Sequence, residues 1–204
     1  MAAGDDRWWR GFDEVVADAV APGARVLDVG CGIGGLVERL AARGFDAVGV
    51  DPRAPPHPRL IQGRVEEVGP IGRFDGVCAV MTLHHVQLDP ALAAIVRLLR
   101  PGGRLLAYEF AWEAYDERAA SWLARHDRTD ADHSVAAWRL EHDDLHTGAT
   151  LRSRLGDAFD LHEETPRPYL ARMLGDHGLE EQEQALIDEG ALPALGRWFV
   201  ALSS

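Results

Sequence analysis

A glycine-rich turn near residue 30 constrains the fold of this chain more than any other feature. The segment from Arg25 to Gly35 reads R-V-L-D-V-G-C-G-I-G-G, and the amphipathic stretch Leu36 to Arg43 follows it. The apolar run predicts a β-strand, and the amphipathic stretch predicts a helix. Because Gly30 and Gly32 have no Cβ atoms, a ligand can approach the backbone N–H groups at the helix start. The turn therefore predicts an α/β protein built around a nucleotide-like cofactor.

The spacing of the glycines fits two classes of cofactor. Gly30-x-Gly32-x-Gly34 suits enzymes that bind S-adenosylmethionine, whereas Gly30-x-Gly32-x-x-Gly35 suits dinucleotide enzymes. Asp51 ends a second apolar segment about 20 residues beyond the first glycine, where a carboxylate can accept hydrogen bonds from both ribose hydroxyls. That arrangement serves either cofactor, so the loop and Asp51 leave the choice open.

Strand and helix patterns alternate along most of the chain, which predicts a doubly wound, mostly parallel sheet. The proline-rich stretch 52–58 predicts an irregular crossing where a helix would otherwise sit. Ligands in such sheets bind beyond the carboxyl ends of the strands, so the tips at Gly30, Asp51, Met81 and Glu109 should converge. The predicted strands are 25–29, 46–51, 60–64, 74–80, 104–110, about 159–165 and 196–202, and the predicted helices are 5–20, 34–43, 89–100, 149–158 and segments within 169–189.

Several motifs together identify a resemblance to a known family. The chain resembles the class I S-adenosylmethionine-dependent methyltransferases, closely over residues 25 to about 110 and loosely over the rest. The resemblance implies a Rossmann-like methyltransferase fold, an α/β sheet of seven strands that ends with an antiparallel strand, for which residues 197–202 are suited. The matching motifs are Val26-Leu27-Asp28-Val29-Gly30-Cys31-Gly32-Ile33-Gly34, Val50-Asp51-Pro52, Phe74-Asp75-Gly76-Val77, Leu83-His84-His85-Val86 and Leu98-Leu99-Arg100-Pro101-Gly102-Gly103-Arg104-Leu105.

The resemblance also implies a set of cofactor contacts. Asp28 suits the ammonium end of the methionine, and it is the best discriminator, because dinucleotide enzymes usually have an apolar or small residue there. The loop Gly30-Cys31-Gly32 should cradle the methionine portion, and Asp51 should hold the ribose. The remaining predicted contacts are Pro52 against the adenine, Val65 through its backbone, with Glu66 out of register for the usual acidic contact, and Met81 at the tip of the fourth strand.

One histidine is predicted to serve the chemistry. His85 matches the family position where His precedes Val, and it could orient an acceptor or take its proton, because imidazole titrates near neutral pH. The alternative is that His85 packs structurally beneath the cofactor, and His84 is a weaker candidate. His142 and His146 are four residues apart, but their flanking carboxylates lack a recognised metal-binding order. No metal is assigned.

Composition limits the partners and the location of the protein. We expect residues 1–204 to form one domain, with 111–147 as a lid or substrate wall rich in Trp, His and acidic residues. The net charge of −12 disfavours nucleic acid as a substrate. No apolar run is long enough to span a membrane, the N-terminus lacks a signal pattern, and the two cysteines suit a reducing compartment. A cytoplasmic protein is expected.

The predicted activity is methyl transfer from S-adenosylmethionine to an oxygen or nitrogen of a small-molecule metabolite. Met81-Thr82-Leu83 stands where DNA amino-methylating enzymes carry Asp or Asn before two prolines, and the chain has no Asn for the ligand set of metal-dependent catechol enzymes. Two alternatives remain: a protein of the same fold that binds this cofactor without transferring methyl groups, and a nicotinamide oxidoreductase. The acceptor, the methylated atom, the need for a base and the oligomeric state are left open.

Overall fold

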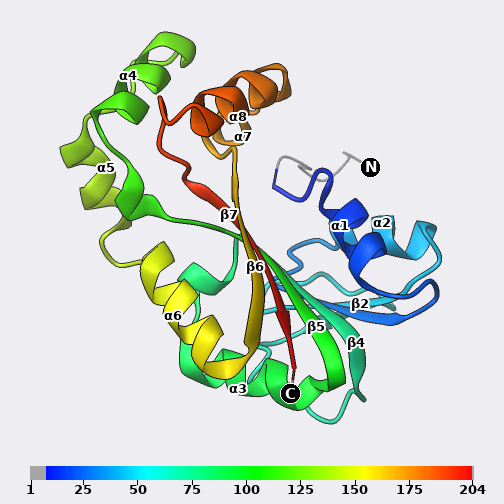
Figure 1. Cartoon of the computed structure of the whole chain (residues 1–204). Coiled ribbons are helices and arrows are strands. Elements are labelled where there is room, and N and C mark those ends of the chain that lie inside the picture. The colour runs from blue at the N-terminus through cyan, green and yellow to red at the C-terminus, as the bar shows by residue number, and fades with distance from the viewer. Residues whose placement is uncertain (1–7, 204) are drawn as a thin grey trace.

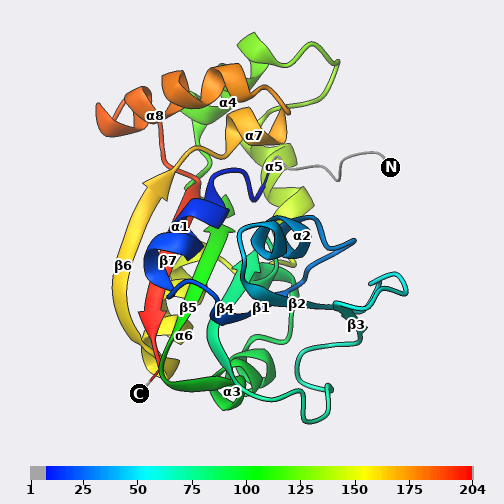
Figure 2. The ribbon, with the colours of Figure 1, turned by 90° about the vertical axis from the view of Figure 1, so that its right-hand side faces the viewer.

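A seven-stranded sheet forms the centre of the molecule. A computed structural model describes residues 8–203, without the side chain of Glu163. The strands lie in the order β3-β2-β1-β4-β5-β7-β6 (Figures 1 and 2). Their bounds are β1 (Arg25–Val29), β2 (Asp46–Asp51), β3 (Leu60–Gln62), β4 (Phe74–Val80), β5 (Leu99–Phe110), β6 (Asp160–Arg167) and β7 (Gly196–Leu202).

The direction of the strands confirms the predicted architecture. The five strands from β3 to β5 pair in parallel, and β7 runs antiparallel between β5 and β6. The sheet is therefore doubly wound and mostly parallel, with the antiparallel final strand that the resemblance implies. Because β1, β2 and β4 are parallel neighbours, their carboxyl ends meet at one edge of the sheet.

Helices cover both faces of this sheet. On one face α1 (Phe12–Ala19) and α2 (Gly35–Ala42) pack against side chains such as Val26, and on the other α3 (Leu88–Leu98) and α6 (Gly148–Ala158) pack against side chains such as Leu27. Val26 and Leu27 are adjacent on β1, so they point to opposite faces and enter two different hydrophobic clusters. Figure 1 shows the two pairs of helices on either side of the strands.

A third hydrophobic cluster lies beyond the end of β5, among the helices at the top of Figure 2. Its aromatic centre includes Tyr115, Trp122 and Trp138. The segment 111–147 was expected to be a lid or substrate wall, with no element assigned within it, and the structure has two helices there, α4 and α5. The elements of this layer are η2 (Trp112–Ala114), α4 (Glu117–His126), α5 (Val135–His142), α7 (Leu170–Met173), η3 (His177–Leu179) and α8 (Glu180–Asp188).

Most other element bounds agree with the predictions, and the differences have local causes. Strands β1, β2, β4 and β7 have the predicted bounds, and 52–58 contains no helix. β3 stops short of residue 64 because Gly63 has φ +157°. β5 begins at Leu99, before the expected residue 104, because Leu99 already pairs with Phe74. α1 begins only at Phe12, after Gly11 with φ +75°, and residues 5–7 of the predicted helix lie outside the described residues.

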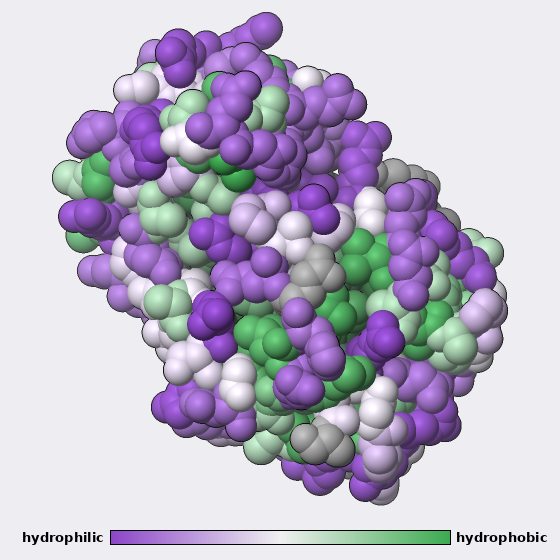
Figure 3. All heavy atoms as spheres, in the orientation of Figure 1, coloured by the Kyte–Doolittle hydropathy of each residue, from purple (hydrophilic) through white to green (hydrophobic). Residues whose placement is uncertain are grey.

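The face of the molecule drawn in Figure 3 is mainly polar. Figure 3 shows hydrophilic side chains over most of one face, especially over the upper helices, with apolar groups toward its middle. Among residues 8–203, no helix combines the length and the apolar content that crossing a bilayer requires.

Candidate functional site

The glycine loop after β1 is a tight turn, as its sequence predicts, but the N–H groups of Gly30, Cys31 and Gly32, which were expected to face a ligand, are hydrogen-bonded within the protein. Gly30 and Gly32 adopt positive φ angles of 77° and 53°. The N–H groups of Gly30 and Cys31 both donate to the carbonyl of Val50, at 2.8 and 3.3 Å, which ties the loop to the end of β2. A Cβ atom on Gly30 would lie 2.0 to 2.8 Å from side-chain atoms of Thr82. The loop therefore sits against the segment that follows β4, an approach that only glycine permits.

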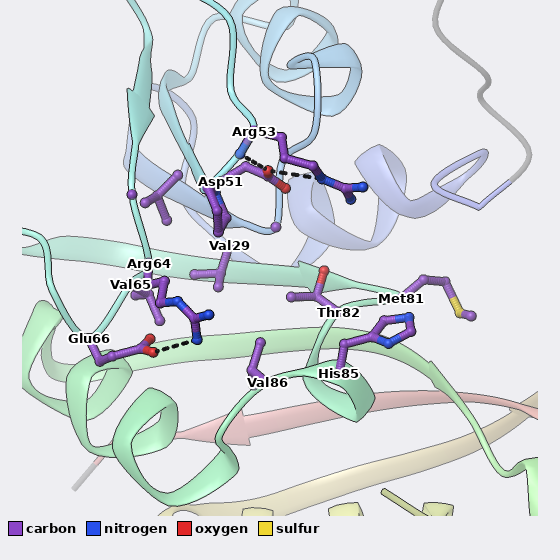
Figure 4. A pocket seen from close by; sticks show the side chains of 14 residues that line it. Val29, Asp51, Arg53, Arg64, Val65, Glu66, Met81, Thr82, His85 and Val86 are labelled. Carbon is purple, nitrogen blue, oxygen red and sulfur yellow. Dashed lines mark hydrogen bonds and ion pairs between the residues drawn. The ribbon is translucent and has the colours of Figure 1, made fainter. Parts of the chain in front are cut away.

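Asp51 links the two strand ends through its carboxylate. The Oδ2 atom accepts a hydrogen bond from the Gly32 N–H at 3.1 Å, and Oδ1 accepts one from the Arg53 N–H at 2.7 Å. The side chain is largely buried, and Figure 4 shows it beside the cavity described next. Each carboxylate oxygen has a second lone pair, so Asp51 keeps the capacity to accept hydrogen bonds from ligand hydroxyls.

A cavity of about 470 Å³ opens at the carboxyl ends of β1, β2 and β4 (Figure 4). Pro52 and Val65 give it apolar wall, and Glu66 lies at its edge, paired with Arg64 at 3.8 Å. We call it the nucleoside cavity, because it combines a carboxylate expected to meet a ribose, that of Asp51, with apolar walls expected to meet a base. The predicted residues that line it are Gly30, Asp51, Pro52, Val65, Met81 and His85.

Asp28 lies under the glycine loop, and no cationic side chain among residues 8–203 pairs with it. It lines a smaller cavity of about 280 Å³ together with Gly30, Cys31 and Gly32. Burial, and then the charge of Asp51, raise the pKa of Asp28 to about 8. Its carboxyl group makes no hydrogen bond to another described residue. A buried carboxyl without a partner in the described part of the chain suits a cationic group of a ligand, so the residues fit the ammonium end of S-adenosylmethionine.

A third cavity, of about 620 Å³, adjoins the nucleoside cavity. We call it the acceptor cavity. Gly30, Met81 and His85 line both, so the two meet at the tips of β1 and β4. Met81 has φ +52°, the one non-glycine residue with positive φ among residues 8–203. The other residues that line the acceptor cavity are the aromatic Trp8, Phe110 and Tyr169, the polar His84, Glu141, His142 and Asp144, and the apolar Val80 and Leu145.

The two histidines after β4 have different surroundings. His85 is exposed to solvent, and partial desolvation, followed by the nearby His84, lowers its pKa. His84 is 3% exposed, and its Nδ1 lies 2.5 Å from Oε2 of Glu109 at the end of β5. The other oxygen of Glu109 accepts the N–H groups of Thr82 and Leu83, at 2.9 and 2.7 Å. Sequence reasoning placed Glu109 at the converging tips but missed this contact.

The remaining histidine pair makes backbone contacts. The Nδ1 atom of His142 lies 2.7 Å from the Trp138 carbonyl, and Nε2 of His146 lies 2.9 Å from the Val86 carbonyl. Within residues 8–203, no three His, Cys, Asp or Glu side chains gather in a metal-binding group. All nine sequence-predicted site residues line one of the three adjoining cavities.

Comparison with known proteins gives a consistent result. Residues 7–162 match the family described as a methyltransferase domain. An uncharacterised methyltransferase of Mycobacterium bovis is 38% identical over 109 residues, which are 48% of this chain and 43% of that protein. A ubiquinone biosynthesis O-methyltransferase of Xanthomonas campestris is 35% identical over 136 residues, 52% of this chain and 56% of that one. The chain therefore matches about half the length of these relatives.

A solved structure has a similar fold over the whole chain. The 1,6-didemethyltoxoflavin-N1-methyltransferase of Burkholderia thailandensis, with S-adenosylhomocysteine bound, superposes with a TM-score of 0.63. The superposition covers 100% of this chain and 80% of that one at 21% sequence identity. At this identity the likeness bears on the fold.

Proposed function

Because the chain belongs to the methyltransferase domain family, as a class I S-adenosylmethionine-dependent methyltransferase, we propose that it methylates an oxygen or nitrogen of a small molecule. Membership of the family sets aside the nicotinamide oxidoreductase. The observation that carries the proposal is the meeting of two cavities at Gly30, Met81 and His85. One cavity has the features of a cofactor site, and the other is a separate space beside it for an acceptor.

The cofactor contacts follow from the lining of these cavities. Asp51 holds the ribose hydroxyls, and Pro52 and Val65 enclose the adenine in the nucleoside cavity. Asp28 and the loop Gly30-Cys31-Gly32 hold the methionine end. When bound, S-adenosylmethionine supplies a methyl group on a sulfonium leaving group. The protein's share is to align the acceptor and exclude water.

The acceptor cavity has the size and lining of a small-molecule site. Trp8 lies 5.2 Å from Tyr169 between ring centroids, and Phe110 stacks on Tyr169 at 4.7 Å. These rings supply flat apolar surface, which suits a planar or partly apolar acceptor. The rim carboxylates Glu141 and Asp144 and the net charge of −12 disfavour a nucleic-acid acceptor. Two similar proteins bear the names of enzymes for small acceptors, a ubiquinone-pathway O-methyltransferase and a toxoflavin-precursor N-methyltransferase.

We propose that residues 111–147 wall the acceptor cavity within a single methyltransferase domain. Glu141 and His142 on α5, together with Asp144 and Leu145, contribute to its lining. Two contacts hold the parts of this segment together. The indole N–H of Trp138 donates to the Trp112 carbonyl at 2.9 Å, and the Tyr115 ring stacks on Trp138 at 4.2 Å.

Methyl transfer is tested by incubating the full chain with S-adenosylmethionine and a panel of phenols, alcohols, amines and ring-nitrogen heterocycles. Mass spectrometry should detect S-adenosylhomocysteine together with an acceptor that gains one methyl group. Boiled protein and samples without acceptor are the controls. A chain that forms no methylated product with any member contradicts the small-molecule proposal.

S-Adenosylhomocysteine is expected to raise the melting temperature of the protein. At about 100 times its dissociation constant, a ligand that binds the folded state alone adds roughly 2.7 kcal/mol of stability. The physical basis is the unpaired Asp28 carboxyl and the Asp51 hydrogen-bond acceptors. Scanning fluorimetry with S-adenosylhomocysteine, NAD and a flavin measures the shift, and a larger shift with NAD contradicts the assignment of the contacts.

The affinity for S-adenosylhomocysteine is expected to increase with pH up to about pH 8. The pKa of Asp28 is about 8 in the free protein, and the carboxyl must ionise to pair with the ligand's ammonium group. Below that pKa the affinity should gain up to about tenfold per pH unit. Calorimetry from about pH 6 to 8 measures the slope, and Asp28→Asn should flatten it.

The stability of the free protein should depend on pH in the opposite sense. Because the pKa of Asp28 is raised on folding, the folded state keeps a proton that the unfolded chain releases above about pH 4. The contribution of this group to stability therefore falls as pH rises from about 4 to about 8. An equal pH slope in the parent and Asp28→Asn, in both measurements, contradicts this role.

A further inference from the structure

We propose that His84, held by Glu109, accepts the proton of the methyl acceptor, and that His85 beside it orients the acceptor. The proposal rests on the proposed function and narrows its substrate class to acceptors that lose a proton, namely hydroxyl groups and protonated or N–H nitrogens. It changes the sequence-based prediction, which placed His85 first and His84 second.

The first support is the fixed contact between His84 and Glu109. Both side chains are buried, at 3% and 0% exposure, and Nδ1 lies 2.5 Å from Oε2. The second carboxylate oxygen accepts the N–H groups of Thr82 and Leu83, which prevents Glu109 from turning away. An ionised carboxylate only accepts hydrogen bonds, so Nδ1 of His84 carries the hydrogen in this contact. The neutral ring then has its lone pair on Nε2.

The second support is the position of the free nitrogen. His84 lines the acceptor cavity, and its Nε2 makes no hydrogen bond to another described residue. The edge-to-face contact with the Phe110 ring, at 4.8 Å, limits rotation of the imidazole. The His84 carbonyl accepts the His146 N–H at 3.1 Å, which ties the backbone of this turn to the segment after α5. The ring is thus held at the cavity wall, and no described residue occupies its Nε2.

His85 lacks this support. It makes no ring-nitrogen hydrogen bond to another described residue, and its ring lies 4.1 Å from that of His84. It lines both the nucleoside and the acceptor cavities, and Figure 4 shows its side chain beside Met81. A solvent-accessible ring at the junction of two cavities is placed to contact the acceptor and set its angle of approach.

The step balances with these residues. The acceptor's oxygen or nitrogen forms a bond to the methyl carbon, the carbon–sulfur bond breaks, and its electron pair stays on sulfur. The acceptor's proton passes to Nε2 of His84, and the resulting imidazolium faces the Glu109 carboxylate. That charge pairing stabilises the protonated ring, as a buried carboxylate does for a catalytic histidine in general. The proton later leaves to water.

A first experiment determines the tautomer of His84 and does not depend on turnover. Nitrogen-15 spectra of the imidazole rings, recorded on the full chain with S-adenosylhomocysteine, should show the His84 proton on Nδ1. In Glu109→Gln, the amide oxygen can keep the two backbone contacts while its NH₂ group faces Nδ1, so the proton should move to Nε2. His84 with its proton on Nε2 in the parent, or doubly protonated up to pH 8, overturns the proposal.

A second experiment measures single-turnover rates with a phenol from the panel and with a ring-nitrogen acceptor that has no proton to lose. His84→Ala should lose about 10²- to 10⁴-fold on the phenol and change little on the ring nitrogen. Added imidazole should restore part of the rate. His85→Ala should mainly raise the acceptor KM. His126→Gln is the matched control, because the ring of His126 contacts the Trp122 carbonyl on α4 and lines neither cavity.

The pH profile separates a base from a structural residue. The groups around His84 that also titrate or carry charge are Glu109, His85, Glu141, His142, Asp144 and Tyr169, and His146, whose N–H donates to the His84 carbonyl. The acidic limb of the phenol rate should disappear in His84→Ala and remain in His142→Gln and in a variant with Glu141 and Asp144 changed to amides. Equal loss on both acceptors, or an unchanged profile in His84→Ala, overturns the proposal. Calorimetry with S-adenosylhomocysteine checks that each variant is folded. His84→Gln is the more conservative substitution and serves as a second variant at this position. If the parent methylates no panel member, the proposed function fails, whatever tautomer the spectra show.

Discussion

Gly30→Ala is expected to cost roughly 2 to 5 kcal/mol of stability and to weaken cofactor binding severely. An L-residue in the left-handed conformation costs about 1 to 2 kcal/mol, and Gly30 has φ +77°. Inserting a methyl group into a packed position typically adds about 1 to 3 kcal/mol. Here the new Cβ would meet the Oγ1, Cγ2 and Cβ atoms of Thr82, at 2.0, 2.5 and 2.8 Å. Rotation of the Thr82 side chain moves the first two atoms and leaves the third.

The loss of binding follows from where the strain falls. Gly30 and Thr82 are in close contact where both line the nucleoside cavity, so pushing them apart moves the loop away from the tip of β4. Urea denaturation and calorimetry with S-adenosylhomocysteine measure the two effects. Gly32→Ala is the matched control. Its φ is also positive, at 53°, but a Cβ there meets no atom within 4 Å.

Two variants separate the sources of the cost. Gly32→Ala should lose only the conformational part, about 1 to 2 kcal/mol. Adding Thr82→Gly to Gly30→Ala should recover the stability that is lost through the steric clash with Thr82, and it should restore some of the cofactor affinity. If Gly30→Ala and Gly32→Ala are equally destabilised, the close approach to Thr82 does not set the requirement for glycine at position 30.

The elements that sequence predicted well are those with strong local signals. β1, β2, β4 and β7 have the predicted bounds because each is a short, largely apolar run, and β1, β2 and β7 are followed directly by glycine, proline or serines. Gly34 directly precedes α2 in the left-handed conformation, so the glycine turn also fixed the start of that helix. The cofactor residues followed because they sit at the ends of these strands.

Helices α4 and α5 could not be predicted from periodicity. On α4 two of the four buried residues are Ala119 and Ala120, whose small side chains give a weak apolar signal. On α5 the sole buried residue is Trp138, and it is held by Tyr115 and Trp112 from elsewhere in the chain. The signals present in the sequence were the caps. Asp116 accepts the N–H groups of residues 118 and 119, and Ser134 accepts that of residue 137.

The His84–Glu109 contact was missed for a different reason. The two residues are 25 positions apart and meet because β4 and β5 are parallel neighbours whose carboxyl ends coincide. The sequence-based prediction placed His85 before His84 because of its family position. In the structure the two rings differ because a carboxylate on the neighbouring strand, Glu109, contacts His84. Locating Glu109 at the tip of β5 was the part of this site that sequence could supply.

Asp51→Ala is expected to weaken cofactor binding by about tenfold to a hundredfold while the protein still folds. Hydrogen bonds to a charged acceptor are worth roughly 1.5 to 3 kcal/mol, which corresponds to that loss of affinity. The substitution also releases the N–H groups of Gly32 and Arg53. Both lie beside a cavity that water can enter, so their loss should cost the fold less than it costs the ligand. Calorimetry with S-adenosylhomocysteine measures the affinity, and thermal denaturation measures the stability.

The control for this prediction lies on the same strand. Asp46→Ala changes the other end of β2, where an exposed carboxylate pairs with Arg25 at 3.2 Å, and it should leave the affinity unchanged. A 2′-deoxy analogue of S-adenosylhomocysteine completes a double-mutant cycle. The parent should bind the analogue more weakly than the natural ligand, whereas Asp51→Ala should bind the two almost equally, because the partner of that hydroxyl is gone. If the analogue loses as much affinity in Asp51→Ala as in the parent, the ribose is held by another residue, and Asp51 serves the loop alone.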